Sequence, residues 1–347
     1  MCNVIYIECV KDRYIINNLS NRTKILFILT LFLMNIVGQA SELNKDDLPD
    51  NTKAFIHLDF DALRKSKLGS TLINWAQKED GGKEKMDEIE KDIGFDLLTA
   101  INGVTISTNG KKDYGMVILK HTASIKKVLS YIKKADGYYA TKYKTSGGKG
   151  SETYIHSVGK KRTNLKEKPD DRGYISFVDK NTAVIAPSRK LTGQGIELVK
   201  GNRSTLSLPV ELSIGIGKVK LPLISSYVDI DALGDVIEDD NIKDMVRDSM
   251  FFLGETDGRL IMNLKITAQS VETAEHMYNM ANGLLGIASL KMKNAPEKMS
   301  LIKAMKISKK QSAIIASFSM SVDKILEYTD PELKEFNINL GDNLNKR

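Results

Sequence analysis

Hydrophobic and polar residues alternate over several short stretches of the chain, and the first such stretch after residue 40 covers 54–61. Alternation with a period of two is typical of a strand that has two different faces. One face of this predicted strand carries His57, Asp59 and Asp61. Asp61 also stands where an aspartate can cap the helix that the pattern predicts over 62–75.

Two hairpins are predicted further along the chain. The dipeptides Asn109-Gly110 and Asp257-Gly258 each separate two apolar runs, which is typical of a hairpin turn. Each hairpin is followed by an amphipathic helical pattern and then by a pair of short apolar runs. The predicted strands are 104–107, 116–119, 174–178, 182–186, 210–216, 250–253, 260–264, 303–307 and 312–318, and the predicted helices include 124–134, 270–285 and 321–328.

The same order of elements occurs twice, which predicts an internal duplication with a period of about 140 residues. Residues 119–123 match 264–268, and residues 182–186 match 312–316, in the same order along the chain. Chance similarity is the alternative, because apolar strands are alike in composition.

These patterns predict an α+β fold made of two similar copies, each an antiparallel sheet faced by helices. We expect the first copy over 41–205, the second over 206–330, and a polar tail over 331–347. The start of the second copy stays open. Residues 228–233 echo 58–63, but they lie too close to the next hairpin for that alignment to continue.

A stretch rich in Gly, Lys, Ser and Asp covers 142–173 and contains only a short apolar strand at Tyr154-Ile155. This composition predicts a mobile surface loop inserted in the first copy. The lysines of 142–168 are expected to contact an anionic surface of the cell envelope. A solvated loop is the alternative, because four nearby carboxylates dilute the positive charge.

The amino-terminal segment 1–40 has the pattern of a signal peptide. Basic residues precede the apolar run 25–37, and small residues precede an expected cleavage between Ala40 and Ser41. The run has thirteen residues, whereas a membrane-spanning helix needs roughly 20. We therefore expect export to the periplasm or the medium; an uncleaved membrane anchor is the alternative. Residues 1–19 do not fit the pattern and suggest a misassigned start or a long leading region.

Composition excludes several classes of chemistry from the exported chain. Its only cysteines, Cys2 and Cys9, precede the expected cleavage site. Disulfides, thiol nucleophiles and cysteine–zinc sites are then excluded after cleavage. Of the 51 basic residues, 41 are lysine and 10 arginine, with a formal net charge of +7. Because base and phosphate recognition favours arginine, we expect no nucleic-acid partner.

His57, Asp59 and Asp61 are the candidate site for chemistry. Spaced by two along one strand face, an imidazole and two carboxylates can ligate a divalent metal ion. The alternative is a polar sheet face on which Asp61 caps the next helix. The chain lacks a complete dinucleotide fingerprint, a phosphate-binding loop and a nucleophile elbow. No catalytic residue and no cofactor are therefore assigned.

The segment 54–69, following a signal peptide, resembles uncharacterised exported proteins of planctomycete and verrucomicrobial bacteria. The resemblance implies two α+β copies over most of the exported chain and supplies no catalytic residues. Together these observations favour an exported, non-enzymatic binding or structural protein of the envelope or extracellular space. The alternatives are a metal-dependent hydrolase that uses His57, Asp59 and Asp61, and a carrier of a lipid or another hydrophobic ligand. A carrier requires an apolar cavity between sheet and helices.

Overall fold

The structure, a computed structural model, describes residues 42–78, 87, 90–91, 96–111, 113–146, 152–159, 172–233, 237 and 239–328. The predicted signal peptide, its cleavage site at Ala40 and Ser41, and the polar tail 331–347 lie outside these residues. Among the described residues, no helix is both long enough and apolar enough to cross a bilayer.

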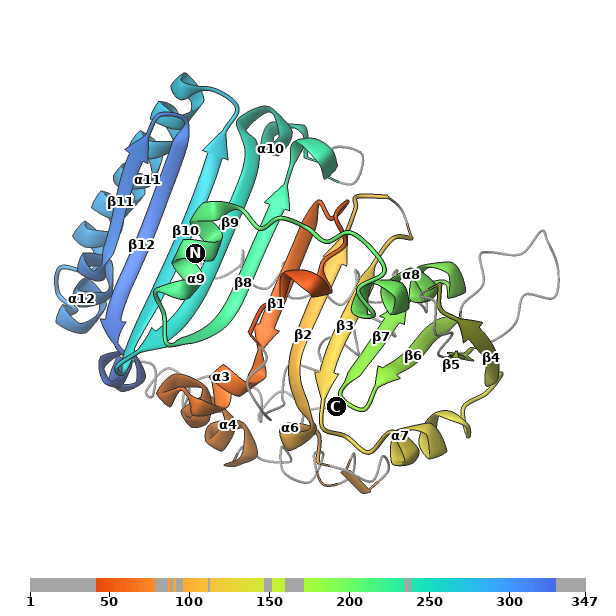
Figure 1. The fold of residues 1–347 in the computed structure, drawn as a ribbon. Helices are drawn as coiled ribbons and strands as arrows, with labels where there is room; N and C mark the ends of the chain where they lie inside the picture. The colour runs from red at the N-terminus through yellow and green to blue at the C-terminus, as the bar shows by residue number, and fades with distance from the viewer. Residues whose placement is uncertain are drawn as a thin grey trace, which may run out of the picture.

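The described chain folds around a twelve-stranded sheet in which every neighbouring pair of strands is antiparallel (Figure 1). The order across the sheet is β11-β12-β10-β9-β8-β1-β2-β3-β7-β6-β5-β4. The strands are β1 (Ala54–Asp59), β2 (Ile101–Thr108), β3 (Met116–His121), β4 (Tyr139–Lys144), β5 (Glu152–Val158), β6 (Gly173–Asp179), β7 (Thr182–Ala186), β8 (Leu221–Asp229), β9 (Val246–Thr256), β10 (Arg259–Ala268), β11 (Met305–Lys310) and β12 (Ala313–Ser321). The expected α+β class and antiparallel sheet are therefore confirmed.

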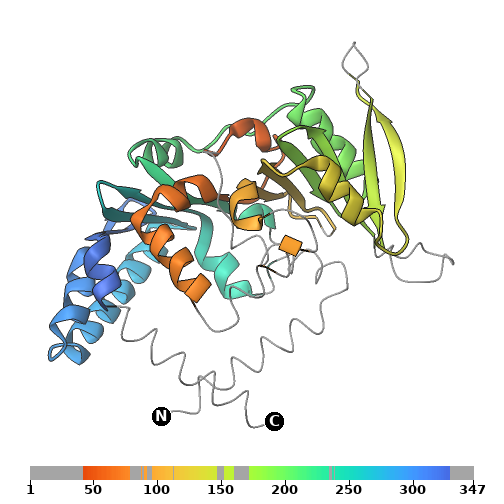
Figure 2. The same ribbon diagram turned by 90° about the horizontal axis from the view of Figure 1, so that it is seen from below.

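Helices cover both faces of the sheet, as Figures 1 and 2 show from two sides. One face, here called the α9 face, carries η1 (Lys45–Asp47), α8 (Arg189–Val199) and α9 (Val210–Gly217). The opposite face, here called the α11 face, carries α3 (Phe60–Lys65), α4 (Lys67–Lys78), α6 (Leu97–Ala100), α7 (Ile125–Ile132), α11 (Val271–Lys291) and α12 (Pro296–Ala304). Two short elements, η2 (Asp231–Leu233) and α10 (Asp240–Met245), connect β8 to β9.

The hydrophobic core lies on both sides of the sheet. On the α9 face, one cluster packs beneath α8 around Ile118, Val184 and Ile196, and another packs beneath α9 around Leu212 and Phe252. Smaller clusters fill the α11 face, beneath α3 and beneath α11. Burial on both faces makes the central strands the rigid frame of the molecule.

The predicted turn of the second hairpin is confirmed. Asp257 and Gly258 have φ angles of 51° and 70° and connect β9 to β10 directly, with Thr256 opposite Arg259. Positive φ at both central residues is the requirement of a tight two-residue hairpin turn, which Asp-Gly meets with little strain.

The prediction of a strand over 210–216 is wrong, because this segment forms α9. Leu212 and Gly215 are buried whereas Val210 and Ile214 are exposed, a spacing of three and four residues that belongs to a helix. Pro209 precedes the helix and Glu211 lies in its first turn, both favourable at a helix start. The run of apolar residues concealed this periodicity, since apolar residues occupy exposed positions of α9 as well.

The predicted mobile loop over 142–173 is also corrected in part. Strands β4 and β5 pair within it at the edge of the sheet, and Ile155 is 1% exposed in the cluster beneath α8. Polar and aromatic residues make up most of these two strands, and this composition concealed the pattern. Residues 147–151 and 160–171 lie outside the described part of the chain.

The strands on the two sides of the neighbouring pair β1 and β8 follow the same order of connections. On one side the order is β1-β2-β3-β7-β6, and on the other it is β8-β9-β10-β12-β11. The register of the central pair is symmetric about Ile56 and Ser226, with Ala54 opposite Val228 and Leu58 opposite Ile224.

Candidate functional site

The three residues of the predicted metal site lie on or directly after β1, and their side chains are buried rather than exposed. His57, Asp59 and Asp61 are 3%, 2% and 1% exposed. β1 lies inside the sheet between β8 and β2, and Phe55, on the same face of the strand as His57 and Asp59, is buried in the cluster beneath α9, so polar residues on this face are removed from water. The alternative interpretation places these residues on a polar sheet face, and the structure shows that this part of the face is buried.

Each of these three side chains has a hydrogen-bond or ion-pair partner close by in the structure. The Nδ1 atom of His57 lies 2.9 Å from the hydroxyl of Thr105 on the neighbouring strand. Asp59 Oδ1 accepts hydrogen bonds from the backbone N–H groups of Asp61 (2.9 Å) and Ala62 (2.8 Å). These contacts account for the burial of polar groups between a strand and a helix.

Asp59, and not Asp61, is the N-cap of the helix that follows β1. The helix begins at Phe60, two residues earlier than predicted, which moves the capping position to Asp59. Asp61 instead forms ion pairs with Arg64 at 2.7 Å and with Lys65 at 3.3 Å, three and four residues along the same helix.

These interactions give His57, Asp59 and Asp61 structural roles at the junction of β1 and α3. Across the described residues, no group of three or more His, Cys, Asp or Glu side chains is arranged to hold a metal ion. The two-residue spacing thus brings an imidazole and two carboxylates into one region without forming a ligand set.

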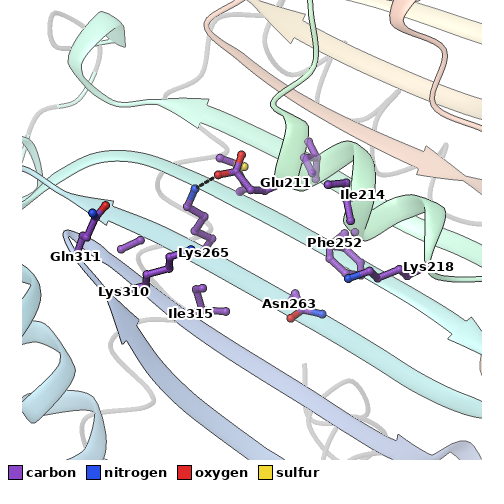
Figure 3. A pocket seen from close by; sticks show the side chains of 13 residues that line it. Glu211, Ile214, Lys218, Phe252, Asn263, Lys265, Lys310, Gln311 and Ile315 are labelled. Atoms are coloured by element: carbon purple, nitrogen blue, oxygen red, sulfur yellow. Dashed lines mark hydrogen bonds and ion pairs between the residues drawn. The ribbon is translucent and has the colours of Figure 1, made fainter.

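The candidate binding site is a groove on the α9 face, between α9 and the strands β9, β10 and β12 (Figure 3). Its volume of about 470 Å³ is within the range of sites that take small ligands. It is lined by Glu211, Leu212, Ile214, Gly215, Lys218, Met250, Phe252, Asn263, Lys265, Lys310, Gln311, Ala313 and Ile315.

Strand register assembles the floor of the groove. Met250 of β9 pairs with Lys265 of β10, which pairs in turn with Ile315 of β12. Phe252 and Asn263 are paired one step further along β9 and β10. Paired residues of neighbouring strands point to the same face, so these five side chains all face the same side as α9.

Gly215 determines how closely α9 approaches the sheet. A Cβ atom at this position would come within 2.3 Å of the Cε1 atom of Phe252. The absence of a side chain lets the helix rest on the aromatic ring, and the neighbouring Leu212 is 2% exposed. α9 thus packs on β8 and β9, and the groove lies at the side of the helix that faces β10 and β12.

The floor of the groove is apolar at Met250, Phe252 and Ile315 and polar at Asn263 and Lys265, and the rim is positively charged. Lys265 donates to Glu211 Oε1 at 2.9 Å, and this hydrogen bond, with the charges of Lys265 and Lys310, lowers the pKa of Glu211. Glu211 is therefore ionised at neutral pH and compensates one lysine. Lys218 and Lys310 form no ion pair with any described residue, which leaves two ammonium groups at the rim.

The corresponding surface in the other half of the sheet is closed. There α8 packs over β3, β7 and β6, and buries Val184 and Ile118 completely or nearly so. In the half of the sheet that contains the groove, the strands at the positions equivalent to β3, β7 and β6 are β10, β12 and β11, which carry Lys265, Ile315 and Lys310. No described helix of comparable size covers these three strands on the α9 face (Figure 1).

Sequence reasoning did not identify the groove residues. The sequence pattern places Gly215 and Ile315 in predicted strands and Lys265 in the stretch 264–268 before a predicted helix. The one available signal was Gly215 inside an apolar run, which indicates a close approach of two backbones or side chains.

Two buried histidines form a second polar cluster, on the α11 face. His121 is 2% exposed and its ring meets Phe177 edge to face, with 5.7 Å between the ring centres. His156 is 7% exposed and its Nδ1 atom lies 2.9 Å from the hydroxyl of Tyr138. Burial lowers the pKa of both histidines, so both rings are neutral at pH 7.

Comparison with known proteins gives matches to solved structures alone. No family model matches the chain, and no curated protein matches its sequence. Crystal form III of TP0453, a Treponema protein, is 9% identical with a TM-score of 0.47, covering 83% of this chain and 97% of that one. Crystal form I of TP0453 is 10% identical with a TM-score of 0.45, covering 83% and 96%.

Proposed function

We propose that this chain is an exported, non-enzymatic binding protein of the envelope or extracellular space, and that its ligand occupies the groove beside α9. The observation that carries the proposal is the combination of a mostly apolar floor with a lysine rim in one concavity. A function of this kind joins the expected binding role with the alternative of a carrier for a hydrophobic ligand.

The chemistry of the groove defines the class of ligand. Phe252, Ile214 and Ile315 offer apolar surface to an alkyl or aromatic body. Lys218 and Lys310 offer ammonium groups to a carboxylate or another anionic group. The ligand is therefore an anionic amphiphile, of which a long-chain fatty acid is the simplest example.

The alternative of a metal-dependent hydrolase is disfavoured, because its candidate residues already form hydrogen bonds and ion pairs within the protein. Asp59 is committed to the N-terminus of α3, and Asp61 to Arg64 and Lys65. Within the groove, the one carboxylate is Glu211, and its ion pair with Lys265 lowers its pKa, which is unfavourable for a general acid or base near pH 7.

A duplication accounts for the location of the groove. The equal strand order on both sides of β1 and β8 supports two related copies, as does the direct pairing of Ile56 with Ser226, which are equivalent positions when 58–63 is aligned with 228–233. The echo of 58–63 in 228–233 fits this symmetry, because Asp59 and Asp229 each accept a backbone N–H of the segment that follows. In this scheme the copies have diverged: α8 closes the surface in one, and the groove occupies it in the other.

Titration with a fluorescent long-chain fatty acid tests the proposed function. Lys218→Glu combined with Lys310→Glu reverses the charge of the rim, and we expect at least a tenfold loss of affinity, roughly the effect of removing one to two favourable charge contacts. Raising the salt concentration should weaken wild-type binding in the same direction.

Lys126→Glu combined with Lys134→Glu is the matched control, because it makes the same change of net charge in α7 and just beyond its end, on the opposite face. Affinity of this control should equal that of the wild type. Absence of binding by the wild type, or an equal loss in both double variants, would remove the groove as the site.

A further inference from the structure

Helix α11 exposes an apolar stripe over its carboxyl-terminal half. Met280, Leu284, Ile287 and Leu290 are 60%, 60%, 53% and 73% exposed. Their spacing of four, three and three residues places them along one side of the helix. Large apolar side chains in a contiguous exposed row mark a surface that another partner covers.

The rest of α11 is attached to the sheet. Its amino-terminal half packs through Ala274, Met277 and Tyr278 against Ile307 of β11 and Ile314 of β12. A Cβ atom added at Gly283 or Gly286 would meet nothing within 4 Å, so the second half of the helix has open space beside it. The first half therefore holds the helix while the second half remains accessible at a corner of the molecule (Figure 2).

Positive charge follows the apolar stripe directly. Residues 291–303 contain four lysines against a single glutamate and no aspartate. Lys291 and Lys293, at and just beyond the end of α11, and Lys298 on α12 are all exposed. An apolar stripe adjoining lysines is the composition of a helix that lies at the interface of an anionic membrane.

We infer that the carboxyl-terminal half of α11, with the lysines that follow it, docks on an anionic lipid surface. Met280, Leu284 and Ile287 enter the boundary between headgroups and acyl chains, and Lys291, Lys293 and Lys298 contact the lipid phosphates. A second copy of the chain is a poorer occupant, because it would bring the same excess of lysine to the contact. The inference is independent of the groove, which lies on the opposite face of the sheet.

Sedimentation with lipid vesicles tests this docking, with the exported form of the protein. We expect at least tenfold stronger binding to vesicles containing phosphatidylglycerol than to vesicles of phosphatidylcholine alone. Leu284→Glu combined with Ile287→Glu should reduce binding to the anionic vesicles at least tenfold, since it adds two carboxylates to the inserting stripe.

Val271→Glu is the control for adding a carboxylate elsewhere on the same helix. Val271 is 57% exposed on the same helix, but it lies nine residues before Met280, which is half a turn away around the axis. Its binding should equal that of the wild type, and all three proteins should have the same far-ultraviolet circular dichroism. Equal binding to both kinds of vesicle, or equal loss in the control, would overturn the inference. It is overturned as well if the double variant changes the sedimentation coefficient without changing vesicle binding, which would indicate a second copy as the occupant.

Discussion

At the scale of single residues, Asp59 shows how a residue typical of a catalytic site can have a structural role. Its carboxylate accepts two backbone N–H groups at the start of α3, at 2.9 and 2.8 Å. The first N–H groups of a helix have no partner within the helix, and burial makes an unsatisfied one costly. Asp59 is 2% exposed, so water does not reach this helix start, and the carboxylate supplies the hydrogen bonds that water would otherwise provide.

Replacement of Asp59 by alanine should therefore destabilise the protein. We expect a loss of roughly 1–2 kcal/mol in the free energy of unfolding, the usual effect of removing an N-cap. Asp59→Asn keeps an acceptor oxygen and should lose less. Urea denaturation of the three proteins measures the effect, and an alanine variant as stable as the wild type would contradict the capping role.

The buried His121 predicts a dependence of stability on pH. Burial lowers the pKa of its imidazole, an effect that the charge of Asp179 opposes only in part. In the unfolded chain the pKa is about 6.5, so the unfolded state takes up a proton first as the pH falls. Stability from this group is complete above about pH 6.5 and declines as the pH falls towards the folded-state pKa. His156 acts in the same direction.

Unfolding by urea between pH 7.5 and pH 5 measures this dependence. The variant His121→Gln keeps a polar side chain without a titrating ring, and its stability should change less over the same interval. A variant that loses as much stability as the wild type over this range would contradict the assignment.

At the scale of secondary structure, α9 shows what the pattern of apolar residues predicts and what it leaves undetermined. Hairpins with Asn-Gly or Asp-Gly turns are local, and the turn at Asp257 and Gly258 follows from the residues themselves. α9 was predicted as a strand because its face towards solvent carries Val210 and Ile214. Its helical form depends on Phe252 and β9, which lie far away along the chain.

The contact between Gly215 and Phe252 can be tested by adding a methyl group. Gly215→Ala places a Cβ where 2.3 Å separates it from the aromatic ring, so α9 or the ring must move. Overpacking of this kind costs about 1–3 kcal/mol, and fatty-acid binding should weaken with it. Gly217→Ala is the control, because its Cβ would meet nothing within 4 Å. Equal stability and equal binding in both variants would contradict the role of Gly215.

At the scale of the whole molecule, the sequence predicted the class of fold and the order of its hairpins, and it did not predict the groove. Each hairpin is followed by a helix and then by a pair of strands, and this order can be predicted from the local pattern of apolar and polar residues. The groove requires Lys265 to stand beside Ile315 and opposite Glu211, which depends on pairing β10 with β12 and on the path of α9. Such contacts between distant segments leave no local pattern in a single sequence.

The whole-molecule arrangement also separates two surfaces. The groove lies on the α9 face, and the apolar stripe of α11 lies on the opposite one (Figures 1 and 2). In the two proposals together, the protein binds an anionic amphiphile on one face while the other face rests on an anionic membrane. The two proposals fail separately, because their variants share no residue.

The most direct test of the proposed ligand site is to map where a ligand binds. A long-chain fatty acid with a photoreactive group on its alkyl chain is bound, irradiated and located by mass spectrometry of peptides. The account predicts labels at Ile214 of α9, Phe252 of β9 and Ile315 of β12, and loss of these labels in the Lys218→Glu and Lys310→Glu double variant. Labels confined to α11, or spread over the surface with no dependence on the two lysines, would contradict it.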